Sequence, residues 1–175
     1  MIGTDINNNL FDVFSYETHY ANGVSVVKEG VNTVYMSETE EEYIKQVFPP
    51  DPDMVATQTT YFADTLTMSG QGHFLKKWNI EIGIWMTYNH DGELIEEINK
   101  DEHYPLSWEE MKTCFLANGI HLGDIRLLRR AQDVETGRYC WILTLHAPRG
   151  VLDMAFFDAQ TGDLINRKQL NYTIF

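Results

Sequence analysis

The feature that most constrains the fold is a series of short segments in which apolar and polar residues alternate. In the first part of the chain these segments cover 57–69, 73–78, 81–88 and 93–99. They are separated by the turn signals Gly70-Gln71-Gly72, Trp78-Asn79 and Asn89-His90-Asp91-Gly92. An alternation with period two is typical of strands that bury one face. Several such strands at short intervals predict an antiparallel meander.

A second series of the same kind follows nearer the C-terminus. Its strands are expected at 125–134, 138–147, 151–157 and 163–170. The turns between them are expected at Glu135-Thr136-Gly137, Pro148-Arg149-Gly150 and 158–162. Residues 138–147 are apolar on both sides of the alternation, so this strand is expected to be central in its sheet, with a helix on one face.

Two helices are expected. Ser107 and Glu110 form a capping-box pattern, and Gly119 provides a stop signal, which together predict a main helix over about 107–118. A possible short helix over about 38–47 follows Ser37 and must end before Pro49. Its apolar residues Tyr43, Ile44, Val47 and Phe48 fall at helical spacing.

The first 36 residues predict short strands and turns. The aromatic and polar residues of 14–20 alternate, and 24–27 and 31–35 are further strand candidates. The proline-rich segment Pro49–Asp53 predicts a loop or hinge. The apolar tail Tyr172–Phe175 is either a closing strand, a docked end or a contact site.

These patterns define an α+β protein that is β-rich, with antiparallel meander sheets and one main helix. Residues 1–105 form an acidic β-rich lobe, and residues 106–175 form a helix plus an antiparallel meander. With 175 residues, the two segments are expected to form one continuous compact unit.

The charge distribution limits the choice of partner. The chain has 26 acidic and 13 basic residues, a net charge of −13. Residues 1–105 hold 18 acidic and five basic residues, whereas residues 106–175 hold eight of each. Nucleic acid and anionic membranes require a basic surface, so neither is expected to bind. A basic protein or a cationic ligand remains possible, as does the simpler alternative that the acids only keep this lobe soluble.

The sequence contains no recognised catalytic motif, and we predict no catalytic residues, cofactor or metal site. His90 and His103 lie near carboxylates but lack the spacing that would bring metal ligands together. The two cysteines, Cys114 and Cys140, are expected to be free thiols, with a disulfide between helix and sheet as the alternative. No secretory signal or membrane-spanning run is recognised, so a cytoplasmic protein is expected.

Two segments resemble known hairpins. The run GIWMTYNHDGELI at 83–95 resembles a MORN-variant hairpin with the pattern G-x-W-x-x-Y-x-x-x-G-x-L, and a degenerate copy over 61–70 lacks the G-x-W. Residues 151–164, which contain a D-x-x-T-G turn, resemble the closing hairpin of PepSY-like or cystatin-like α+β modules. In this order, over about 74–170, the segments resemble bacterial immunity proteins of polymorphic-toxin and type VI secretion systems.

That resemblance implies a non-enzymatic antitoxin that binds and blocks a cognate toxin acting in the cytoplasm. Nucleases, NAD-consuming enzymes, ADP-ribosyltransferases and deaminases are all open as the toxin. The alternatives are a small ligand-binding or enzymatic α+β barrel and a non-inhibitory adaptor. The oligomeric state and the role of residues 1–60 are left open.

An acidic face on segments 38–53 and 91–103 is the expected contact surface, because it would attract a basic cleft. The partner-binding candidates are Glu38, Glu40, Glu41, Glu42, Tyr43, Asp51, Asp53, Glu93, Glu96, Glu97, Asp101, Glu102, Tyr104 and Trp108. Among them the aromatic residues are the expected anchors, since a few buried aromatic contacts carry most of the energy in many interfaces.

Overall fold

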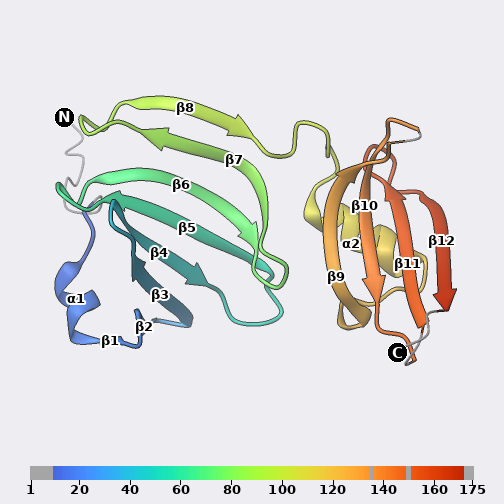
Figure 1. Cartoon of the computed structure of the whole chain (residues 1–175), viewed down its shortest axis with the longest axis horizontal. Coiled ribbons are helices and arrows are strands. Elements are labelled where there is room, and N and C mark those ends of the chain that lie inside the picture. Colours follow the sequence, from blue (N-terminus) through green and yellow to red (C-terminus); the bar gives the residue numbers. More distant parts are fainter. Residues whose placement is uncertain (1–9, 135, 149–150, 172–175) are drawn as a thin grey trace. The chain divides into compact units, whose positions relative to one another are not determined.

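The computed structural model describes residues 10–134, 136–148 and 151–171 (Figure 1). The protein is β-rich, with two antiparallel sheets and one main helix, as the sequence predicts. The chain divides into two units, Met1–Lys100 and Asp101–Phe175, slightly before the boundary expected from the charge distribution. The apolar tail lies outside the described residues.

Unit 1 is an eight-stranded meander in which each strand pairs with its neighbours along the chain (Figure 1). Its strands are β1 (Tyr20–Ala21), β2 (Val24–Glu29), β3 (Asn32–Glu38), β4 (Glu42–Phe48), β5 (Val55–Phe62), β6 (Met68–Leu75), β7 (Ile80–Tyr88) and β8 (Leu94–Asn99). The expected strands around 24–27, 31–35, 81–88 and 93–99 are confirmed. The proline-rich segment connects β4 to β5.

The short helix expected over 38–47 is wrong, because this segment is a hairpin turn followed by β4. The Thr39 hydroxyl accepts hydrogen bonds from the backbone N–H groups of Glu41 and Glu42, at 3.3 and 3.0 Å. These bonds are like those of a helix cap, but here they close a turn. The apolar residues after it lie between β3 and β5, where aromatic and β-branched side chains fit well.

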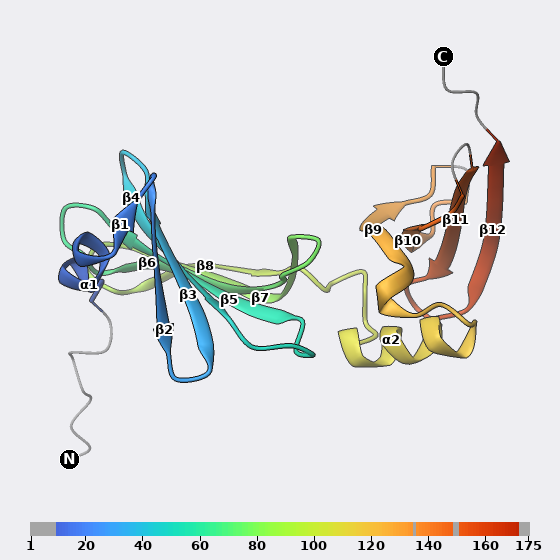
Figure 2. The ribbon, with the colours of Figure 1, turned by 90° about the horizontal axis from the view of Figure 1, so that it is seen from below.

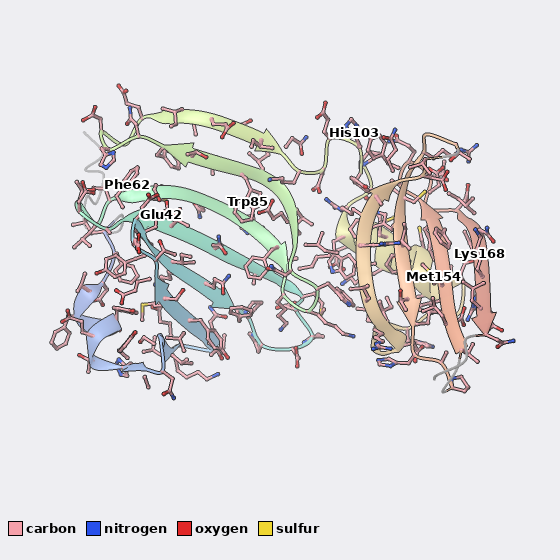
Figure 3. The ribbon with its side chains drawn as sticks, in the orientation of Figure 1. Glu42, Phe62, Trp85, His103, Met154 and Lys168 are labelled. Carbon is pink, nitrogen blue, oxygen red and sulfur yellow. The ribbon has the colours of Figure 1, made fainter. Side chains whose placement is uncertain are left out.

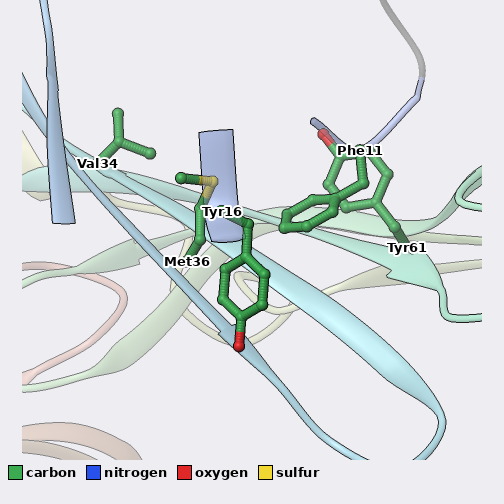
Figure 4. Packing of buried hydrophobic residues seen from close by; sticks show 5 residues of the cluster. All are labelled: Phe11, Tyr16, Val34, Met36 and Tyr61. Atoms are coloured by element: carbon green, nitrogen blue, oxygen red, sulfur yellow. The ribbon is translucent and has the colours of Figure 1, made fainter. Parts of the chain in front are cut away.

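The strand expected over 14–20 is wrong for residues 14–18, which belong to the helix α1 (Val13–Thr18), and only Tyr20 lies in a strand, the short β1. The Asp12 side chain caps it by accepting a hydrogen bond from the Ser15 N–H at 3.0 Å. Tyr16 is buried, whereas Phe14 is 80% exposed, so the helix packs on the core through the face that carries Tyr16. Figure 4 shows the core beneath it, which contains Phe11, Tyr16, Val34, Met36 and Tyr61.

The turn expected at Gly70-Gln71-Gly72 lies instead in the middle of β6. The expected strand 57–69 is interrupted earlier, by the turn between β5 and β6, where Leu66 has a positive φ of 61°. Gly72 is needed for space rather than for turning. A Cβ at this position would lie 2.1 Å from the Trp85 indole, which covers the strand there.

Unit 2 packs one helix against a four-stranded meander, and Figure 2 shows the helix on one face of the sheet. The elements are α2 (Trp108–Ala117), the short 3₁₀ helix η2 (Leu122–Asp124), β9 (Ile125–Gln132), β10 (Tyr139–Leu145), β11 (Val151–Asp158) and β12 (Leu164–Asn171). The capping box of Ser107 and Glu110 is confirmed. The helix contacts the sheet through the ring pairs Trp108–Trp141 and Phe115–Phe157.

The central position expected for 138–147 is confirmed, because β10 lies between β9 and β11 and is largely buried. The turn between β11 and β12 follows the D-x-x-T-G pattern. The Asp158 carboxylate accepts from the N–H groups of Gln160 and Thr161, at 2.8 and 3.2 Å. Gly162 has a φ of +75° and lies against Cys114 of the helix, where a Cβ would collide. Both cysteines are free, as expected.

A buried carboxylate in unit 2 predicts a measurable pH dependence. Asp153 is 5% exposed and accepts hydrogen bonds from Arg167, at 3.1 and 2.8 Å, and from Gln169 at 3.2 Å. The Arg167 guanidinium holds the pKa of Asp153 below its ordinary value of 3.8. A lowered folded-state pKa gives stability that is present above the ordinary value and is lost as the pH falls through the folded value.

We therefore expect Asp153→Asn to be less stable than the wild type near pH 7, and this difference in the free energy of unfolding to shrink below about pH 4. Urea denaturation at several pH values measures it. Asp163→Asn is the control, because Asp163 is exposed and has no ion pair among the described residues. A stability difference that stays constant from pH 7 to pH 3 would contradict the prediction.

Candidate functional site

The meander brings acidic turns together. In an antiparallel meander, alternate turns lie at the same end of the sheet, and Figure 1 shows the β3–β4, β5–β6 and β7–β8 turns at one end. This acidic hairpin end carries the exposed carboxylates Glu38, Glu40, Glu41, Asp64, Asp91 and Glu93. The described residues of the three turns, 39–41, 63–67 and 89–93, include no lysine or arginine. Asp64 and Asp91 are not among the contact residues expected from the sequence.

The three turns are joined by specific contacts. The Ala63 N–H donates to the Glu41 carbonyl at 3.0 Å, which ties the second turn to the first. His90 Nε2 lies 3.4 Å from Asp64 Oδ1, and its ring stacks on Phe62 with centroids 3.7 Å apart, which ties the third turn to the second. His90 therefore connects two turns through its contacts with Asp64 and Phe62. From the sequence, His90 was not expected to bind a metal ion.

The third turn is held by its own side chain. Asn89 Oδ1 accepts from the N–H groups of Asp91 and Glu93, at 3.0 and 2.9 Å. Its amide also donates to Glu93 Oε2 at 3.0 Å, and Gly92 adopts a φ of +80°. The Glu93 carboxylate is thus positioned by the turn, which keeps a negative charge in one place at this end of the sheet.

The remaining acidic candidates lie elsewhere. Asp51 and Asp53 are in the β4–β5 connection at the opposite end of the sheet, where Asp51 pairs with Lys76 at 2.9 Å. Glu96 and Glu97 are exposed on β8, which is one of the two edge strands of the unit 1 sheet. Asp101 and Glu102 belong to unit 2. The acids of the two expected segments, 38–53 and 91–103, therefore lie in several places. Only the acids at the β3–β4, β5–β6 and β7–β8 turns lie at one end of the sheet.

The expected aromatic anchors are not on the surface. Tyr104 and Trp108 are only 8% and 6% exposed, because they fill the core of unit 2, and burial raises the pKa of Tyr104 to about 12. Tyr43 is half-buried and stacks on Phe11, with ring centroids 4.5 Å apart. These aromatic residues lie close to acids in the sequence, which suggested contact sites. In the structure their rings pack against other side chains of the same unit.

A buried arginine organises this part of unit 2. The Arg130 guanidinium lies 4.3 Å from the ring centroid of Trp141 and 4.5 Å from that of Tyr104. Arg130 Nη1 donates to Asp101 Oδ1 at 2.7 Å, and burial lowers the pKa of Arg130. Asp101 is therefore a structural counter-charge rather than a free contact residue.

A hollow on the unit 1 sheet, which the sequence analysis did not foresee, has a volume of about 270 Å³. We call it the Glu42 hollow. It is lined by Glu42, Gln58, Thr60, Ser69, Gly70, Gln71, Trp85, Met86, Thr87, Ile98 and Lys100. Figure 3 labels Glu42, at the start of β4, and Trp85, on β7. No local sequence signal brings these residues together, because they come from the five strands β4 to β8 and from Lys100, which directly follows β8.

Within the described ranges, no group of three or more His, Cys, Asp or Glu side chains could hold a metal ion. His103, the other histidine considered, stacks on Tyr139 with ring centroids 4.0 Å apart. Across the part of the chain that the structure describes, no helix combines the length and apolarity needed to cross a membrane. No known protein family, no curated protein and no solved structure matches the chain.

Proposed function

We propose that this chain is an immunity protein, which binds a cognate toxin acting in the cytoplasm and blocks it. The acidic hairpin end is the contact surface in this proposal. The observation that carries it is the convergence of six exposed carboxylates, five from three connected turns and one, Glu38, from the end of β3. The described residues of those turns include no lysine or arginine. Such a surface complements a basic cleft.

Inhibition of the toxin would depend on electrostatic attraction between the two proteins. Toxins that act on nucleic acids or nucleotides need basic clefts to hold phosphate groups. A concentrated negative surface speeds encounter with such a cleft and favours one orientation of binding. Once bound, the turns would occupy the entrance and exclude the substrate. The charge of unit 2 is nearly balanced, so the attraction would come mainly from unit 1.

The resemblance to immunity proteins supports the same proposal through the hairpin over 83–95. Trp85 and Tyr88 lie on β7, Asp91-Gly92 forms the turn, and Leu94 begins β8. These are the residues on which the resemblance to a MORN-variant hairpin is based, and in this proposal they belong to the contact surface. The same hairpin supplies the third turn of the acidic hairpin end, so the resemblance and the charge argument concern the same segment.

Co-expression tests the proposal. The chain is produced together with the product of the adjacent gene, in cells that this product alone prevents from growing. We expect growth to be restored and the two proteins to co-purify. Co-purification without restored growth would indicate an adaptor. The absence of both restored growth and co-purification would reject the immunity function.

A further inference from the structure

Glu42 differs from the other acids at this end of unit 1, because its carboxylate is half-buried and oriented. Ser69, which is 4% exposed, donates its hydroxyl to Glu42 Oε1 at 2.6 Å and lies 2.8 Å from the Thr60 hydroxyl. No lysine or arginine among the described residues forms an ion pair with Glu42. A partly desolvated carboxylate without a counter-charge gains more from a cation than an exposed one does.

The Glu42 hollow also provides apolar walls. Met86, Ile98 and Trp85 line it together with Glu42. Its volume of about 270 Å³ is below the range of roughly 300–1,000 Å³ that is typical of pockets for drug-sized ligands. The hollow is therefore suited to a single long side chain rather than to a larger molecule.

The Trp85 wall is held in place by its neighbours. Its indole lies against Gly72, where any Cβ would collide, and Nε1 donates to the His73 carbonyl at 3.1 Å. The cation nearest to this ring, Lys100, lies 5.7 Å from its centroid and pairs with Glu81 at 2.6 Å. Lys100 also lines the hollow, but its ion pair is with Glu81, and none of the ion pairs among the described residues includes Glu42.

We infer that the Glu42 hollow accepts an arginine side chain of the partner protein. The guanidinium would bind the Glu42 carboxylate, and its hydrocarbon stem would pack against Trp85, Met86 and Ile98. Arginine fits better than lysine, since its planar fork can pair with a carboxylate through two hydrogen bonds, whereas the lysine ammonium is a point charge. This inference rests on the proposed function, in which the partner is a basic protein.

The test uses the full chain and a defined probe, the peptide acetyl-Gly-Arg-Gly-amide. The peptide is titrated into isotope-labelled protein, and chemical shifts of residues lining the hollow are followed by NMR. We expect saturable binding, at least tenfold weaker for the peptide with citrulline in place of arginine, because citrulline keeps the shape but lacks the charge. Glu42→Gln should weaken binding of the arginine peptide by at least tenfold.

Glu41→Gln is the matched control, because Glu41 is the exposed neighbour with the same charge. It should leave the affinity for the arginine peptide within twofold of the wild type. The NMR spectrum of each variant reports its fold directly, and Glu42→Gln keeps an oxygen that can accept the Ser69 hydrogen bond. Equal affinity for both peptides, equal loss in both variants, or no binding would overturn the inference.

The outcome is independent of the partner experiment. The peptide titration measures binding at the Glu42 hollow alone, whereas co-expression measures inhibition of a toxin. Peptide binding without any rescue of growth would reject the immunity function and leave an arginine-binding site. Rescue without peptide binding would retain the immunity function and remove the arginine subsite.

Discussion

Association with the cognate toxin is expected to slow by at least tenfold at low salt when Glu40, Glu41 and Glu93 are all changed to lysine. These side chains are exposed at the acidic hairpin end, so the changes alter charge with little effect on packing, apart from the loss of the hydrogen bond from the Asn89 amide to Glu93. Long-range attraction raises association rates by ten- to a thousandfold in steered complexes. Stopped-flow or surface-plasmon measurements at several salt concentrations would give the rate. The difference from wild type should decrease as salt increases, because the Debye length falls.

The matched control is a triple variant with the same change in net charge, made outside the acidic hairpin end. Asp53, Glu102 and Asp163 are exposed and suitable for this purpose. Their change to lysine should slow association by less than threefold. Equal slowing by the two triple variants would show that net charge alone steers the encounter, and would remove the acidic hairpin end as the contact surface.

The second large effect concerns stability, and follows from the buried arginine of unit 2. Asp101→Ala is expected to lower the free energy of unfolding by about 2–3 kcal/mol. The Arg130 side chain is only 10% exposed and would keep its charge without the counter-charge, which lies 2.7 Å away in the wild type. Chemical denaturation followed by far-ultraviolet circular dichroism measures the change.

A double variant separates the lost pairing from lost packing. In Asp101→Asn with Arg130→Met, both charges are absent, and the methionine can still cover the rings of Tyr104 and Trp141. Replacing a buried ion pair by apolar groups is often close to neutral, so more than half of the lost stability should return. A loss below about 0.5 kcal/mol in Asp101→Ala would mean that the pair contributes no more than an exposed one.

Elements with local signals could be predicted from the sequence. The helix α2 starts where Ser107 and Glu110 form their capping box, because both hydrogen bonds join residues three positions apart. The hairpin of β7 and β8 follows from its alternation and from Gly92, which adopts the positive φ its turn needs. The central place of β10 follows from apolar residues on both of its faces.

Elements decided by distant contacts could not be predicted in this way. Thr39 can cap a helix or close a turn with similar bonds, and pairing of β4 with β3 and β5 selects the turn. Gly72 resembles a turn residue in sequence, but it provides space for Trp85. The alternation around Tyr16 suggests a strand, yet packing on the sheet selects a helix.

The sequence by itself determined the charge of the chain and its concentration before residue 105, since both are sums over residues. Only the tertiary structure decided which acids meet. Antiparallel pairing places alternate turns at one end of the sheet, so residues far apart in sequence, such as Glu41, Asp64 and Glu93, share one surface. Asp51 and Asp53, although close to Glu41 in sequence, lie one strand length away, because β4 runs between them.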